Sequence, residues 1–252
     1  MRFGDLTYLE IGELAQAGWV AIVPTGCTEQ QGPHLPTDLD TYWVTQASEA
    51  ISNAASERVG IGSLVVPALP FGPTPEHRGY GSGYIDLPQE LHEQVLYAIL
   101  DSLASQGFRR LVVVTGCGQH RVEAPIARLN ATHAPRCRAA RLELPLHDIW
   151  CEVGDVRVPG GHADSFATSI ALYLRPASVR AELIRNPRHG PVAWDDPQLD
   201  FSRVSPSGVV GDPSHASAAL GKRLWEAVVD AGVAALQEIV ADGEGEGNRR
   251  DR

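Results

Sequence analysis

The sequence is short of basic side chains, and lysine is almost absent. It has 21 Lys and Arg residues against 31 Asp and Glu, a formal net charge of −10 and a pI near 5.3. The only lysine is Lys222. Binding to nucleic acid or to an anionic membrane surface needs clusters of Lys and Arg that neutralise phosphates. The charge balance therefore argues against both kinds of partner.

Long apolar runs are also missing. No segment reaches the roughly 20 apolar residues of a membrane-spanning helix. The first 18 residues, MRFGDLTYLEIGELAQAG, carry acids where a secretory signal peptide needs an apolar stretch. We therefore expect a cytoplasmic protein. The cysteines are widely spaced and form no CxxC pair, so thiols are expected rather than disulfides in that compartment; they are Cys27, Cys117, Cys137 and Cys151.

Length and composition are those of an ordinary globular protein. The chain has 252 residues, of which 43% are hydrophobic and 21% charged. This length suits one α/β domain with a large core. We predict a single domain over residues 1–241. Residues 242–252 contain no apolar side chain and are expected to form a disordered tail.

Buried-strand patterns alternate with helical patterns along the chain. The strand candidates are nearly continuous apolar runs that end at Gly or Pro, as in parallel strands covered on both faces. The alternation predicts an α/β fold with a doubly wound, largely parallel sheet and helices on both faces. The expected strands cover residues 18–26, 62–72, 108–120 and 138–150, and the expected helices cover residues 7–18, 40–55, 89–107, 122–134 and 222–240, with a helix opened by the loop at 160–176 and a polar, proline-rich stretch at 186–208.

The loop after the first expected strand carries metal-binding side chains. Its sequence, TEQQGPHLPTDLD, contains Glu29, His34 and Asp40. In parallel sheets, ligands bind outside the carboxyl ends of the strands, where this loop begins. Position 31, where a second nitrogen ligand is expected, is a glutamine. The loop therefore looks like part of a metal site.

Five motifs follow one another in a fixed order over nearly the whole chain. They are PTGCTEQQGPHLPTDLD at 24–40, GPTPEH at 72–77, TGCGQH at 115–120, HADSFATS at 162–169 and SGVVGDP at 207–213. In this order they resemble the motifs of the creatininase (creatinine amidohydrolase) family. Each motif alone is weak, but the five together favour the fold strongly.

The resemblance implies a homo-oligomeric, doubly wound α/β hydrolase, and it suggests a hexamer. Members of this family bind two divalent metal ions, usually zinc or manganese. They hydrolyse C–N bonds in small cyclic amides, formamides or related groups. Glu29 matches the first glutamate ligand of the family, Asp40 its bridging aspartate, and His162 the histidine near the scissile bond.

Other ligand positions of the family are changed in this chain. Gln31 stands in place of the first-motif histidine, Cys117 replaces a second histidine, and the late glutamates are replaced by Gln119 or Ala167. A glutamine offers only a neutral carbonyl oxygen, whereas a cysteine thiolate binds zinc well and manganese less well. We therefore expect one zinc ion rather than two metals, with manganese or no metal as the alternatives.

In the resulting hypothesis, Glu29, Asp40 and Cys117 hold a single zinc ion with an open fourth position for water. His162, His34 and His120 are candidates for proton transfer or for a further ligand. The simpler interpretations are that Asp40 caps a helix, that Cys117 fills space in the core and that His34 shapes its loop. Candidate contacts to a small-molecule substrate are Gln31, His77, Arg78 and Gln119.

Three functions remain open from the sequence. The first is a single-zinc amidohydrolase in which His162 donates a proton to the leaving nitrogen. The second is a metal-free enzyme that uses Cys117 as a nucleophile beside His120 or His162, or that carries out acid–base cyclisation or transfer. The third is an inactive homologue that only binds a ligand.

Overall fold

A four-stranded parallel sheet forms the centre of the molecule. The structure is a computed structural model that describes residues 1–187, 189–196 and 198–247. The strand order is β2-β1-β3-β4, and every pairing is parallel. The strands are β1 (Val20–Thr25), β2 (Ser63–Val65), β3 (Arg110–Thr115) and β4 (Arg138–Arg141).

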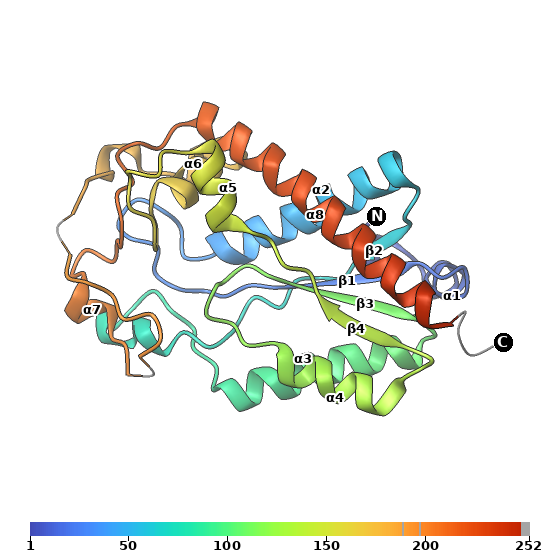
Figure 1. Cartoon of the computed structure of the whole chain (residues 1–252). Coiled ribbons are helices and arrows are strands. Elements are labelled where there is room, and N and C mark those ends of the chain that lie inside the picture. The colour runs from blue at the N-terminus through green and yellow to red at the C-terminus, as the bar shows by residue number, and fades with distance from the viewer. Residues whose placement is uncertain (188, 197, 248–252) are drawn as a thin grey trace.

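Helices cover both faces of this sheet (Figure 1). Alternate strand residues face opposite cores, so Val20 and Ile22 pack on one side while Ala21 and Val23 pack on the other. This arrangement confirms the predicted α/β fold. The first face is covered by α2 (Leu39–Val59), α5 (Leu146–Val153), α6 (Ser165–Leu174) and α8 (Ala218–Gly247), and the second by α1 (Tyr8–Gln16), α3 (Gln89–Ser105) and α4 (Glu123–His133).

The strand predicted at 138–150 is correct only for its first four residues. The observed strand ends at Arg141, and helix α5 begins at Leu146, directly after Pro145. Leu146, Ile149 and Trp150 pack into the core on one side of this helix, which is the spacing of a helical face. Proline cannot donate a ladder hydrogen bond, so it favours an end to the strand here.

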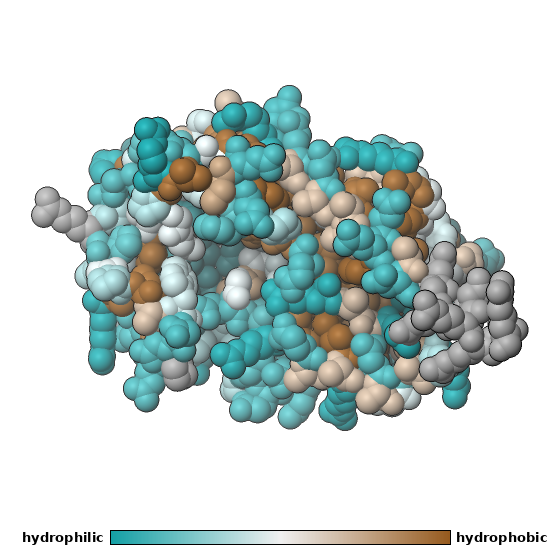
Figure 2. All heavy atoms as spheres, in the orientation of Figure 1, coloured by the Kyte–Doolittle hydropathy of each residue, from teal (hydrophilic) through white to brown (hydrophobic). Residues whose placement is uncertain are grey.

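The C-terminal helix is longer than its periodicity indicated. Helix α8 continues to Gly247, through residues 242–247 that the sequence assigned to a disordered tail. The rest of that tail, 248–252, lies outside the described residues. No helix in the described part of the chain is both long and apolar enough to cross a membrane. On the face shown in Figure 2, hydrophobic side chains are visible in small groups between hydrophilic ones.

Short elements and loops gather beyond the carboxyl ends of the strands. There the 3₁₀ helix η2 (Pro75–Tyr80) packs against the short helix α7 (Phe201–Val204). Helix α7 lies within the stretch predicted as polar loop at 186–208. The remaining 3₁₀ helices are η1 (Phe3–Asp5), η3 (Pro176–Ser178) and η4 (Ala181–Leu183).

Candidate active site

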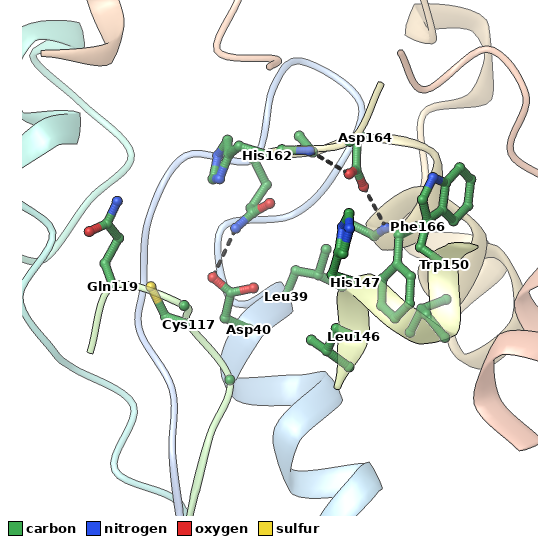
Figure 3. A pocket seen from close by; sticks show the side chains of 18 of the residues that line it. Leu39, Asp40, Cys117, Gln119, Leu146, His147, Trp150, His162, Asp164 and Phe166 are labelled. Atoms are coloured by element: carbon green, nitrogen blue, oxygen red, sulfur yellow. Dashed lines mark hydrogen bonds between the residues drawn. The ribbon is translucent and has the colours of Figure 1, made fainter. Parts of the chain in front are cut away.

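A cavity of about 820 Å³ opens beside the carboxyl end of the sheet. Its polar lining includes Glu29, Asp40 and Cys117, and its apolar lining is rich in aromatic rings. In Figure 3, Asp40 and Cys117 lie on one side of this space, while Trp150 and Phe166 lie on the other. The sequence did not single out any of the lining aromatic residues, which are Trp43, Trp150, Phe166, Trp194 and Phe201.

Two cysteines follow the ends of the two central strands and lie side by side. The parallel register pairs Thr25 of β1 with Thr115 of β3, and the backbone N–H of Gly116 donates to the Thr25 carbonyl at 2.8 Å. Cys27 and Cys117 each follow two residues later. The sequence predicted a role for Cys117 and none for Cys27. The signal that was missed is the tripeptide TGC, which ends both strands.

The first turn of α2 fixes both strand ends. Thr41 Oγ1 donates to the carbonyl of Cys27 at 2.9 Å, and Trp43 Nε1 donates to the carbonyl of Gly116 at 3.0 Å. A Cβ atom on Gly26 would lie 2.5 Å from Thr41 Cα, and one on Gly116 would clash with the same turn. Only glycine fits at these two positions, so the helix turn that carries Asp40 is held against both thiols.

Gln31 joins the two carboxylates of the site. Its Nε2 donates to Asp40 Oδ2 at 2.9 Å and to Glu29 Oε1 at 3.3 Å, and the Cys27 thiol donates to Asp40 Oδ2 at 3.1 Å. Burial raises the pKa of Glu29 to about 7, and it raises the pKa of Asp40 well above its usual range. The helix N-cap position belongs to Asp38, which leaves Asp40 inside the first turn with its carboxylate directed to the site.

Two histidines face Glu29, and the nitrogen that each presents to it differs in protonation. His77 Nε2 lies 3.4 Å and His162 Nδ1 lies 3.6 Å from Glu29 Oε1. Gln30 Nε2 faces His77 Nδ1 at 3.1 Å, while the Gln30 carbonyl accepts from His162 Nε2 at 2.7 Å. The Gln30 amide is oriented by the N–H of Gly32, which donates to its oxygen. His77 therefore carries its proton on Nε2, whereas His162 presents a lone pair at Nδ1.

The loop of His162 is tied to the last sequence motif. The backbone of His162 exchanges two hydrogen bonds with Val210, at 2.8 and 2.9 Å. Asp164 caps α6 by accepting from the N–H of Ala167, and its other oxygen accepts from Gly161. Burial lowers the pKa of His162 to about 3, so the ring is neutral. The fourth and fifth motifs thus hold a neutral imidazole against Glu29.

Three predicted site residues do not line the cavity in the described structure. Arg78 is exposed and pairs with Asp86, its Nε donating to Oδ2 at 2.6 Å, so it lies away from this cavity, whereas the sequence predicted a contact to substrate. His34 is fully buried, and its Nε2 bonds Thr168 Oγ1 at 2.9 Å, which matches a loop-shaping role. His120 does not line the cavity, although its ligand atom lies within 4.8 Å of both thiol sulfurs. Gln31, His77, Gln119 and His162 all line the cavity.

The donor atoms of the site fit one metal ion. Ligand atoms of Cys27, Glu29, Asp40 and Cys117 all lie within 4.8 Å of one another, and those of the two thiols and His120 form a second such group. Thiolate, carboxylate and imidazole together form a ligand set for zinc. A third group joins Glu29, His77 and His162, but the Nε2 proton of His77 makes it a poorer ligand.

Comparison with known proteins decides the family. The sequence profile described as "Creatininase: Creatinine amidohydrolase" matches residues 4–236. The chain belongs to the creatininase family. A relative from Mycobacterium tuberculosis, "Mycofactocin precursor peptide peptidase", is 32% identical over 90% of this chain and 88% of its own length. "Creatinine amidohydrolase" from Pseudomonas putida is 27% identical over 93% of this chain and 95% of its own length.

Solved creatininase structures share the fold. A mutant creatininase of the "Zn-Zn type" superimposes with a TM-score of 0.76 at 24% identity, covering 94% of this chain and 96% of that chain. The named relatives are hydrolases, so the hydrolase assignment of the family is supported. In this creatininase-family chain, Ala167 lines the cavity and offers no ligand atom.

Proposed function

We propose that this chain is a metal-dependent amidohydrolase that cleaves an amide-type C–N bond with one zinc ion. The proposal is carried by the convergence of Glu29, Asp40 and Cys117, whose ligand atoms lie within 4.8 Å of one another beside the cavity. The thiol favours zinc over manganese, because manganese prefers oxygen ligands. A zinc ion there would act as a Lewis acid that polarises a carbonyl oxygen and lowers the pKa of water.

The cavity supports a substrate with an apolar body. Its volume of about 820 Å³ lies in the range of roughly 300–1,000 Å³ that holds drug-sized ligands. Trp150, Phe166 and Phe201 supply aromatic surface for such a body. The substrate class is therefore a cyclic amide, formamide or related amide metabolite that carries an apolar or aromatic substituent.

His162 orients the attacking water in this proposal, while Glu29 is counted among the candidate zinc ligands. The free Nδ1 of His162 lies 3.6 Å from Glu29 Oε1, and both side chains line the cavity. Burial lowers the pKa of His162 to about 3, so its lone pair at Nδ1 accepts a hydrogen bond from the water rather than its proton. The backbone carbonyl of Gln30 holds the other ring nitrogen, so the ring keeps one orientation beside the water.

The metal-free alternative, with Cys117 as nucleophile, has less support. A hydrogen bond with Cys27 lowers the pKa of Cys117, but burial and the carboxylates of Glu29 and Asp40 outweigh it and raise the pKa to about 11. Reactive cysteines need a lowered pKa, because the thiolate is the nucleophile. A bound cation would reverse this balance by stabilising the thiolate.

Metal analysis of protein purified without an affinity tag tests the proposal. We expect about one zinc per chain and chelator-sensitive hydrolysis of a panel of cyclic amides, formamides and aryl amides. Asp40→Asn should abolish this activity. The matched control is Asp38→Asn, because Asp38 lies two residues away and pairs with Arg175 on the surface. Protein that stays metal-free after reconstitution with zinc, or activity that persists in chelator, would overturn the proposal.

A further inference from the structure

The imidazole of His120 lies close to the thiols of Cys27 and Cys117. Ligand atoms of Cys27, Cys117 and His120 lie within 4.8 Å of one another, and all three residues are buried. The register of β1 and β3 places the two thiols in equivalent positions on neighbouring strands. His120 follows in the same loop as Cys117, and its backbone N–H reaches the Cys117 carbonyl. The three side chains thus come from two short, fixed loops.

His120 lacks the hydrogen bonds that a buried imidazole needs. It is 2% exposed, and neither Nδ1 nor Nε2 has a hydrogen-bond partner. Its ring packs over the backbone of Gly72, where a Cβ atom would lie 2.3 Å from Nε2. The neighbouring ring, His92, bonds Thr25 rather than His120. A buried polar atom without a partner is costly, so the loop conformation points to a ligand for this ring.

One oxygen of each carboxylate already has a donor. Asp40 Oδ2 accepts from Gln31 and from the Cys27 thiol, and Glu29 Oε1 accepts from Gln31, whereas the buried Glu29 Oε2 has no hydrogen-bond partner. A cation bound between the two oxygens that Gln31 bridges would have to displace the Gln31 amide. A cation bound to the thiols leaves both hydrogen bonds of this amide in place.

We propose that Cys27, Cys117 and His120 are the three protein ligands of the zinc ion, and that Glu29 and Asp40 flank its open fourth position. This inference rests on the single-metal site of the proposed function and changes its ligands. Two thiolates and one imidazole with an open position form a known kind of catalytic zinc site. Binding converts two thiols to thiolates and releases two protons to solvent, so two negative charges balance the ion. The acids then contact the substrate side of the site.

Cobalt substitution tests the ligands without relying on activity. Full-length protein, freed of zinc under reducing conditions, is titrated with Co²⁺ alone. We expect the intense near-ultraviolet absorption of thiolate-to-cobalt charge transfer at one equivalent. Cys27→Ser and Cys117→Ser should each weaken the absorption and lower zinc affinity by at least about 100-fold, more than the roughly 10–100-fold of outer-shell changes. Cys137→Ser is the matched control, since Cys137 is buried away from the site.

Variants of His120 and of the two carboxylates distinguish this inference from the proposed function. His120→Gln should lower zinc affinity by a similar factor, whereas Glu29→Gln and Asp40→Asn should keep the charge-transfer band while losing hydrolysis. Retention of zinc by Cys27→Ser and His120→Gln, with its loss from Asp40→Asn, would overturn the inference and leave the single-metal hydrolase intact. Absence of any metal binding would overturn both. If a variant unfolds, the intensity of the charge-transfer band in the unmodified protein gives the same decision, because the inference requires two thiolate ligands and a band of one thiolate or none contradicts it.

Discussion

The side-chain amide of Gln31 lies 2.9 Å from Asp40 Oδ2, where the family pattern has an imidazole. The same nitrogen reaches Glu29 Oε1 at 3.3 Å, so one neutral amide donates to both buried acids. An imidazole at this position would bring a metal ligand, but an amide N–H₂ brings only hydrogen-bond donors. Gln31 therefore makes hydrogen bonds to both acids at a position where the family resemblance predicts a metal ligand.

Replacing Gln31 by methionine should destabilise the metal-free protein. Methionine has a similar length but leaves the carboxylates of Glu29 and Asp40 without their amide donor. Loss of a partner from a buried polar group costs about 1–3 kcal/mol. We expect the free energy of unfolding to fall by about 2 kcal/mol, and the midpoint of thermal unfolding to fall by roughly 4–8 °C. Circular dichroism of chelator-treated protein measures both.

Gln119→Met is the control for this substitution. Gln119 also lines the cavity, but its side chain does not bridge the two acids. Its replacement should change the free energy of unfolding by no more than about 0.5 kcal/mol. Equal losses in the two variants would show that Gln31 is not the link between Glu29 and Asp40.

Thiol reactivity should separate the four cysteines. Cys151 is exposed, whereas Cys27, Cys117 and Cys137 are buried and burial raises the pKa of Cys27 and Cys137. We expect a disulfide reagent to modify one thiol per metal-free chain quickly and the other three only on unfolding. The rapid phase should disappear in Cys151→Ser. Rapid labelling at Cys117 would instead favour the metal-free nucleophile.

The fold followed from the sequence because its central strands are buried on both faces. Val20–Thr25 is covered throughout, so its apolar run has no alternation, and its loop is recognisable by Gly26 and Glu29. The edge of the sheet was harder to predict. After Arg141 the chain turns at Pro145 into a helix, and an apolar run of this length has the same composition in either state.

The site was less predictable because its contacts are made across the sheet. Cys27 acquires a partner only through the register of two strands that lie some 90 positions apart in the chain. Arg78 sits next to His77 in the sequence, yet the 3₁₀ turn directs the histidine to Glu29 and the arginine to Asp86. Neighbouring residues on such a turn face different directions, which sequence spacing alone did not reveal.

Gly72→Ala should disturb the proposed zinc site through His120. The added Cβ would lie 2.3 Å from the imidazole, so the ring must move away from the thiols or the loop must shift. We expect a loss of about 1–3 kcal/mol in stability and a lower zinc affinity in a chelator competition assay. Gly118→Ala is the matched control, because a Cβ there has open space beside Cys117. Identical zinc affinities in the two variants would contradict the placement of His120 as a ligand.

Acid should weaken the fold through His34, which lies outside the metal-binding group. Burial lowers the pKa of His34 from 6.5 to about 4, so the unfolded chain binds more protons between these pH values. Stability from this residue is therefore complete above about pH 6.5 and is lost as the pH falls toward 4. Between pH 7 and pH 5 the protein should lose about 2 kcal/mol more than His34→Gln, whose amide can still bond Thr168 but does not titrate. Urea unfolding of both proteins at the two pH values measures the difference, and parallel losses would mean that folding does not lower the pKa of His34.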